Sequence, residues 1–261
     1  MTTPVQRALG RVEDEREHVR KLRDGFDGFE REVRQLSPVS PRSHRQSGGV
    51  AAGGAVTAQS LAGRASRDHC GRIRELFADH VQALVRVGDE SLLETVRGEL
   101  GDRVALALAP TTDTSFTEPI KSQLLSATAQ RQTKLDAMER ALGAEADSLR
   151  RTVEATPAIE DCLDPADRRP LLSLGFAELR ERHEALLSCE RRLEQLVESR
   201  QQHLQAATGA DATVGLTHHS LTDYLYDMLP TTYPALSTHT ELLEFCREQQ
   251  RAVRDHLTRR V

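Results

Sequence analysis

The sequence predicts an all-α protein: an elongated antiparallel bundle of three long coiled-coil-like helices, followed by shorter C-terminal helices. Three observations predict this fold class. Apolar residues recur at spacings of three and four over long stretches, glycine and proline gather between these stretches, and only nine of the 261 residues are aromatic. The core must therefore be largely aliphatic, as in helical bundles.

The first long helix is expected over residues 4–36, where the heptad pattern is strongest. Thr3 can cap its start, Pro4 fits the first turn, and Ser37-Pro38 stops it. Apolar spacings alternating between three and four through about five heptads predict a coiled-coil seam, in which only Glu15 is polar. The seam residues are Val5, Ala8, Val12, Glu15, Val19, Leu22, Phe26, Phe29, Val33 and Leu36.

Residues 37–60 are predicted to form a flexible linker rich in glycine, serine and proline. The segment Gly49 to Gly54 matches the first six positions of a phosphate-binding P-loop. Ala55 and Val56, however, stand where that loop needs a lysine and a hydroxyl for the phosphates and magnesium. The segment also follows a helix rather than a strand, so a tether is the better interpretation.

The remaining residues, 61–261, are predicted to form one helical domain with a C-terminal cap at about 220–261. The run "VALALA" at 104–109 fits either a buried helical turn or a short extended segment. Polar residues at seam positions of the third long helix predict a partly wet interface there. Helices are expected at about 62–86, at 91–100, from about Pro119 with apolar positions as far as Val153, at 174–207, in "SLTDYLYDMLP" and at 234–259. The segment 164–170 is expected to be a break.

Composition limits the function classes. The net charge of −5 provides no field that would attract nucleic acid. No apolar run approaches the length of a membrane span, and no signal peptide is evident, so we expect a cytoplasmic protein without a membrane partner. Cys70, Cys162, Cys189 and Cys246 contain no CxxC pair and are expected to be reduced thiols, with any further role left open.

Several segments resemble a haloarchaeal family of uncharacterised helical proteins. They include "DESLLETVRGELGDRVALALAP", "LDAMERALGAEADSLR", "SLGFAELRERHEALL" and "SLTDYLYDMLPTTYPALSTHTELLEFCREQQRAVRDHL". The resemblance covers most of the chain and is weakest through residues 37–60. It implies a haloarchaeal, cytosolic origin, which fits a sequence with three lysines among its 35 basic residues. It implies no activity and assigns no functional residue.

Motifs for catalysis or metal binding are incomplete. "HEALL" at 183–187 begins like a zinc-protease motif, but Leu187 replaces its second histidine, so His183 is expected to be a packed core residue. His69 and His80 can share a helical face but lie about 16 Å apart along it, too far for one ion. Cys246 and His256 could form a nucleophile pair, although both fall at core spacing. We therefore predict no catalytic residue, no metal, no cofactor and no small-molecule ligand.

Candidate interaction residues lie on the first helix and near the C-terminus. Phe26 and Phe29 lie in the first seam, which could pair with a second copy; a charge at either position would then split a dimer. Tyr224, Tyr226 and Tyr233 are clustered and could anchor a partner, or could seal the end of the bundle. Arg251 and Arg254 belong to the C-terminal basic concentration.

The predicted function is a non-enzymatic interaction, scaffold or regulatory role, with coiled-coil surfaces binding the protein itself or another protein. Two alternatives stay open. One is a DNA-associated regulator using the C-terminal helical region, although nucleic acid binding is disfavoured by the acidic net charge. The other is an enzyme of unrecognised type.

Overall fold

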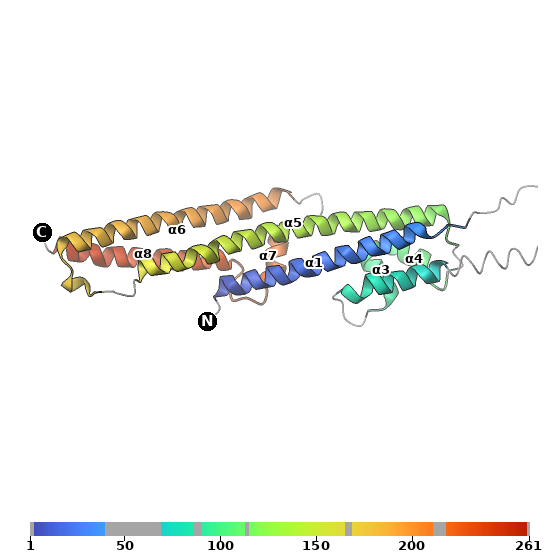
Figure 1. Ribbon diagram of the computed structural model, residues 1–261, viewed down its shortest axis with the longest axis horizontal. Helices are drawn as coiled ribbons and strands as arrows, with labels where there is room; N and C mark the ends of the chain where they lie inside the picture. Colours follow the sequence, from blue (N-terminus) through green and yellow to red (C-terminus); the bar gives the residue numbers. More distant parts are fainter. Residues whose placement is uncertain are drawn as a thin grey trace, which may run out of the picture. The chain divides into compact units, whose positions relative to one another are not determined.

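The computed structural model describes residues 3–39, 69–85, 90–112, 115–164, 169–210 and 218–259, without the side chains of 206–210 and 218–220. Within these residues the secondary structure is helical and includes no strand, which confirms the all-α class. Most of the predicted linker lies outside the described residues. The helices are α1 (Pro4–Gln35), residues 69–80, η1 (Gln82–Leu84), α3 (Leu92–Leu100), α4 (Asp102–Leu108), α5 (Glu118–Leu163), η2 (Leu171–Ser173), α6 (Phe176–Ala210), α7 (His218–Tyr226) and α8 (Pro234–Thr258) (Figure 1).

The three helices expected to be long are present, with 32 residues in α1, 46 in α5 and 35 in α6. α5 ends at Leu163, directly before the break expected at 164–170, and Pro157 lies inside the helix. Proline has no N–H, so α5 lacks the helical bond to the carbonyl of Val153 at this point. The ambiguous run at 104–109 lies mostly in α4, a helix.

Local signals explain where α3 begins and ends. Ser91 and Glu94 form a reciprocal capping box, in which each side chain accepts a hydrogen bond from the other residue's backbone N–H. Gly101 follows the last residue of α3 with φ of +90°, a conformation that L side chains rarely adopt. The predicted helix at 91–100 and its glycine stop are therefore confirmed.

The chain divides into two compact units, and α1 and α5 contribute residues to both. Unit 1 comprises residues 1–16 and 140–261, and unit 2 comprises residues 17–139. These units do not follow the predicted division at residues 36 and 60.

In unit 2, aromatic rings join α1 to the helix at 69–80. Phe77 packs edge-to-face against Phe29, with ring centroids 5.5 Å apart, and against Phe26 at 6.4 Å. Gly25 allows the two helices to approach closely, because a Cβ there would lie 2.3 Å from the carbonyl oxygen of His80. The contact therefore requires both large rings and a residue without a side chain.

In unit 1, α6 runs antiparallel to α5. Glu145 of α5 meets Arg200, whereas Cys162, further along α5, meets Ala185, earlier in α6. α8 packs beside both helices, as Figure 1 shows. Their shared core includes Ala155, Ile159, Leu163, Leu179, Leu186, Leu193 and Val253.

The seam of α1 is buried within the chain. Nine of its ten predicted positions are buried and Leu36 is half-buried. Glu15, the polar exception, is only 6% exposed. The α1 seam therefore packs against the chain's own helices, which leaves little of it for a second molecule. Among the described helices, none has the length and hydropathy required to cross a bilayer.

Candidate functional site: a buried ionic cluster and an apolar groove

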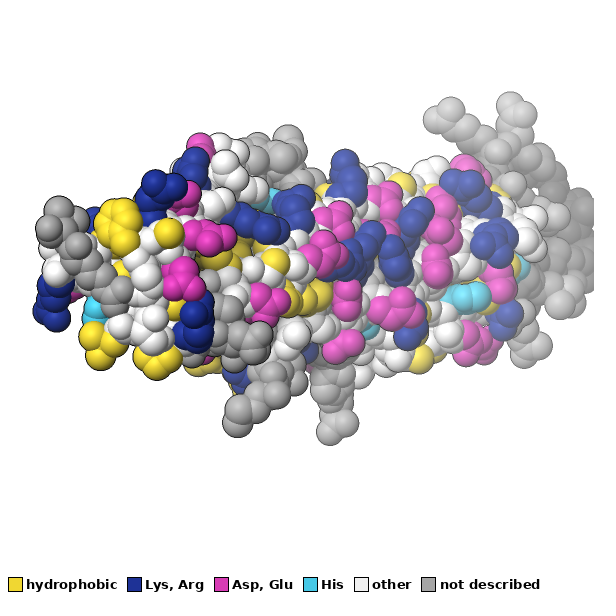
Figure 2. Space-filling view, turned by 60° about the vertical axis from the view of Figure 1, so that its left-hand side comes forward, with side chains coloured by type: hydrophobic (Ala, Val, Ile, Leu, Met, Phe, Trp, Pro, Cys, Tyr) yellow, Lys and Arg dark blue, Asp and Glu magenta, His cyan; other side chains and the backbone are white. Residues whose placement is uncertain are grey.

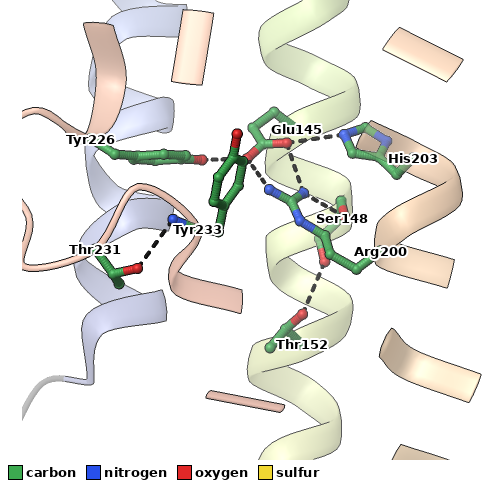
Figure 3. A network of polar contacts seen from close by, with 8 residues as sticks. All are labelled: Glu145, Ser148, Thr152, Arg200, His203, Tyr226, Thr231 and Tyr233. Carbon is green, nitrogen blue, oxygen red and sulfur yellow. Dashed lines mark hydrogen bonds and ion pairs between the residues drawn. The ribbon is translucent and has the colours of Figure 1, made fainter. Parts of the chain in front are cut away.

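A cluster of ionisable side chains lies inside unit 1, where α5, α6 and α7 meet (Figure 3). α5 provides Glu145, α6 provides Arg200 and His203, and α7 provides Tyr226. We call these four residues the ionic cluster. Burial of full charges is costly unless each is paired and hydrogen-bonded, so the partners of every group matter.

Glu145 and Arg200 form the centre of the ionic cluster. Their side chains are 0% and 2% exposed, and two guanidinium nitrogens donate to the two carboxylate oxygens at 2.7 and 2.8 Å. Arg200 Nη1 also donates to Ser148 Oγ at 2.9 Å. Burial by itself lowers the pKa of Arg200, but the hydrogen bonds and the negative charge of Glu145 raise it more. The pair is therefore ionised.

Two further side chains complete the coordination of Glu145. His203 Nε2 lies 3.0 Å from one carboxylate oxygen, and the Tyr226 hydroxyl donates to the other. Burial, followed by the charge of Glu145, raises the pKa of Tyr226, so the phenol stays protonated and acts as a donor. The carboxylate thus connects α5 to α6 and α7 through charge-assisted bonds.

His239 of α8 adjoins the ionic cluster as a neutral group. It is 1% exposed, and neither of its ring nitrogens has a hydrogen-bond partner. Burial and then the positive charge of Arg200 lower the pKa of His239 to about 4. A proton added to this ring would be a second buried positive charge beside Arg200.

The ionic cluster serves packing better than chemistry. Glu145 accepts hydrogen bonds from three side chains, and its carboxylate is fully enclosed. A catalytic carboxylate needs a free lone pair and access to substrate. The geometry instead fixes the register of α5 and α6, since a shift of one residue would leave both charges buried and unpaired.

An open groove lies elsewhere on unit 1, between the start of α1, the second half of α5 and α8. Its volume is about 340 Å³, within the range of small binding sites. Phe245 (37% exposed) and Leu242 form part of its apolar surface, while Glu160 and Glu241 provide carboxylates. None of the described residues that line the groove is basic. The groove is lined by Thr3, Pro4, Val5, Gln6, Val153, Thr156, Pro157, Glu160, Thr238, Glu241, Leu242 and Phe245.

The structure places the predicted interaction residues of the first seam in the core. Phe26 and Phe29 are both 0% exposed, because Phe77 and neighbouring helices cover them. Their assignment as interaction residues is therefore corrected: in the folded chain they cannot contact a partner. The same heptad pattern fits an internal seam and an intermolecular one, and the sequence could not distinguish the two.

The three predicted tyrosine anchors have different surroundings. Tyr226 is buried with its hydroxyl on Glu145, so the anchor interpretation is wrong for this residue. Tyr224 is 52% exposed, and its hydroxyl donates to Glu15 at 3.3 Å. Tyr233 is 38% exposed. Tyr224 therefore accounts for the polar residue in the predicted seam, since it gives the Glu15 carboxylate a donor.

The C-terminal basic residues are partly neutralised. Arg251 and Arg254 are exposed, but their neighbour Arg247 pairs with Glu190 at 2.7 Å and with Glu194 at 3.1 Å. Hydrogen bonds from Arg247 and then from Gln250 lower the pKa of Glu190. Basic and acidic side chains alternate across the face shown in Figure 2.

The histidines considered for metal binding have other surroundings. His80 Nε2 lies 3.1 Å from Glu32, and the ring of His69 packs against Phe116. Over the described part of the chain, which leaves out Asp68, no group of three metal-ligating side chains is placed to hold an ion. His183 is half-buried on α6.

The chain belongs to a family known by the description "Domain of unknown function (DUF7260)", whose match spans residues 3–250. That range includes the ionic cluster, the groove-lining residues and all but the last residues of α8. No curated protein and no solved structure matches the chain.

Glu145 is not among the residues predicted from the sequence, although its place in an apolar series marks it as unusual. Glu145 continues the spacing of Leu135, Met138, Leu142 and Leu149, so it is a charged residue in an apolar series. Arg200 is likewise a polar residue in the third long helix's seam. Two opposite charges at seam positions of two long helices indicate a buried pair. The groove gave no such signal, because three distant segments form it.

Proposed function

We propose that the protein is a non-enzymatic interaction protein that uses the groove of unit 1 to bind a segment of another protein. The segment has an apolar side chain next to lysine or arginine. The single observation that carries this proposal is the composition of the groove: exposed apolar side chains beside Glu160 and Glu241, with no basic residue among the described residues that line it.

The apolar part of the groove supplies the attraction. Phe245 is exposed on α8, Leu242 is partly buried beside it, and Pro157 provides an apolar ring from α5. A partner side chain that covers them removes apolar surface from water, which is the main favourable contribution to such contacts. The absent helical bond at Val153 leaves its carbonyl oxygen without its usual donor, so a partner N–H could use it.

The charged part of the groove selects the partner. Glu160 and Glu241 come from different helices and give the groove two carboxylates. An acidic segment would meet two carboxylates of like charge, whereas a basic residue beside the apolar anchor would be attracted. This charge complementarity favours a basic, apolar protein segment over an acidic one.

The proposal keeps the non-enzymatic interaction role predicted from the sequence, but it assigns binding to a different surface from the predicted coiled-coil seam. The α1 seam is occupied by the chain itself, so the proposal assigns binding to the groove. A haloarchaeal source and a cytoplasmic location are also proposals, supported by the scarcity of lysine. The elongated antiparallel arrangement and the coiled-coil character of the long helices likewise stay proposals that rest on the heptad pattern.

Selection from a library of random displayed peptides tests the proposal with the full chain as bait. We expect enrichment of peptides in which an apolar residue adjoins lysine or arginine. Their affinity should fall at least about tenfold for Phe245→Asp, since anchor contacts dominate such interfaces. Leu187→Asp is the matched control, because Leu187 is 39% exposed on α6 and lies outside the groove.

Three outcomes would overturn the proposal. Selection could yield no peptides, it could yield acidic ones, or the enriched peptides could bind Phe245→Asp as well as they bind the native chain. A chain that self-associates with rising concentration, and loses this in Phe245→Asp, would identify a second copy as the occupant instead. The DNA-associated alternative predicts salt-sensitive duplex binding that weakens when Arg251 and Arg254 are neutralised.

A further inference from the structure

Three of the four cysteines meet inside unit 1, although they are distant in the sequence. Cys162 comes from α5, Cys189 from α6 and Cys246 from α8. Cys189 and Cys246 belong to one cluster of buried core residues, and Cys162 packs against that cluster. We call these three residues the thiol cluster. The fourth cysteine, Cys70, belongs to unit 2.

Backbone contacts show why the thiols converge on Cys189. Cys246 Sγ donates to the carbonyl of Leu186 at 3.4 Å, and Cys162 Sγ donates to the carbonyl of Ala185 at 3.7 Å. These carbonyls lie three and four residues before Cys189, on the side toward which a helical side chain leans. Both neighbouring helices thus direct their thiols to the same turn of α6.

Accessibility differs among the three thiols. Cys162 is half-buried, whereas Cys189 is 5% and Cys246 is 0% exposed. Burial, followed by the neighbouring thiols, raises the pKa of Cys189 to about 12, and burial also raises the pKa of Cys246. An oxidant from solution therefore meets Cys162 first, with a protonated thiol directly behind it.

We infer that the thiol cluster is a redox site at which a hydroperoxide oxidises Cys162 and Cys189 to a disulfide that joins α5 to α6. The inference does not depend on the proposed binding function. It differs from the sequence-based expectation of four separate reduced thiols, because it uses an arrangement that spans three helices.

The chemistry balances in two steps. The Cys162 sulfur, as the thiolate, attacks one peroxide oxygen; the O–O bond breaks, and the other oxygen takes up a proton and leaves as water or alcohol. The product is a sulfenic acid on Cys162. The Cys189 sulfur then attacks the Cys162 sulfur, the S–O bond breaks, and the hydroxyl leaves with the thiol proton as water. The two sulfurs lose two electrons, and the peroxide gains them.

Cys246 allows a second disulfide, between Cys189 and Cys246, to replace the one between Cys162 and Cys189. Its sulfur can attack Cys189 in the disulfide and release Cys162 as a thiol, without any oxidant. The disulfide then joins α6 to α8 in the core. Gln250 Nε2 lies 3.9 Å from Cys246 Sγ and can donate to the sulfur as it gains negative charge.

Treatment of the native full chain with hydrogen peroxide, followed by thiol titration in denaturant, tests the inference. We expect the number of free thiols to fall from four to two, with the chain still monomeric on a non-reducing gel. Peptide mapping should find Cys189 in every disulfide, paired with Cys162 or Cys246. Oxidation should speed up as pH rises, because thiolates are the nucleophiles.

Matched variants make the result specific. Cys189→Ala should abolish the intramolecular disulfide, while Cys246→Ala should retain the Cys162–Cys189 pair. Cys70→Ala should form the same disulfides as the native chain, with free thiols falling from three to one. Four remaining thiols, stable oxidation of Cys162 without a disulfide, or a disulfide-linked dimer through Cys162 would each overturn the inference. Since the mapping uses the native chain, misfolding of a variant leaves the test intact.

Discussion

Where α1 meets the helix at 69–80 in unit 2, the contact consists of three phenylalanine rings. Where α5 meets α6 in unit 1, the contact includes a buried carboxylate paired with a guanidinium. The first contact is stabilised by removal of apolar surface from water and tolerates small shifts at modest cost. The second contributes little net free energy but is costly to break, because separation leaves a buried charge alone.

The two units therefore use different means to fix helix register. Unit 2 combines ring packing with a glycine that admits the neighbouring backbone. Unit 1 uses a directional ionic cluster, with a neutral histidine next to it. The units can also be observed separately, since the chain has no tryptophan and Tyr224, Tyr226 and Tyr233 all belong to unit 1. Tyrosine fluorescence reports unit 1, whereas circular dichroism reports both.

The largest effect is expected from Glu145→Leu. This change leaves Arg200 buried without its counter-charge and should lower the free energy of unfolding of unit 1 by about 3–5 kcal/mol. Urea unfolding followed by tyrosine fluorescence measures it. Adding Arg200→Leu should restore most of the loss, and Glu194→Leu on the exposed surface of α6 should have little effect. Equal losses in the single and double variants would contradict a paired buried charge.

The next largest effect is a pH dependence from His239. Its pKa is about 4 in the folded chain and 6.5 as the ordinary value, so the unfolded chain binds more protons between these values. The free energy of unfolding is therefore highest, as far as His239 is concerned, above about pH 6.5. It decreases as pH falls toward 4, by about 3 kcal/mol in all.

The variant His239→Leu removes the titrating group, so comparing it with the native chain measures the pH dependence that comes from His239. Between pH 6.5 and 4 the native chain should lose more stability in unit 1 than the variant does. Identical pH profiles in tyrosine-monitored unfolding would show that His239 does not titrate as the burial predicts.

A smaller effect is expected from Gly25→Ala in unit 2. The added methyl would lie 2.3 Å from the carbonyl oxygen of His80, and backbone cannot move aside as a flexible side chain can. We expect a loss of roughly 1–3 kcal/mol, seen by circular dichroism. Gly10→Ala is the matched control: nothing lies within 4 Å, so better helix propensity should stabilise the chain by about 0.5–1 kcal/mol. A stabilising Gly25→Ala would contradict the close helix contact.

Much of the helical architecture could be predicted from the sequence, because apolar periodicity, capping residues and prolines act locally. The seam of α1 and the stop at Gly101 are of this kind. Pro157 shows where local signals are insufficient, since proline usually ends or kinks a helix and α5 continues past it.

The site depends on contacts between distant segments. Arg200 was visible as a polar seam residue, but its partner lies 55 residues away on another helix. The groove and the thiol cluster are each formed by residues from three helices. Spacing within one segment of the sequence cannot predict which distant segments come together. Phe26 and Phe29 show the reverse problem: the sequence identified the seam, while only the structure shows what covers it.

The chain's own helices cover the α1 seam, and we propose the groove as the interaction surface. Hydrogen exchange of α1 amides in the native chain, measured over a wide range of protein concentration, tests this most directly. We predict slow exchange along residues 19–33 that does not change with concentration, because the protection comes from the same molecule. Fast exchange at low concentration that becomes slow as concentration rises would show that a second molecule covers the seam.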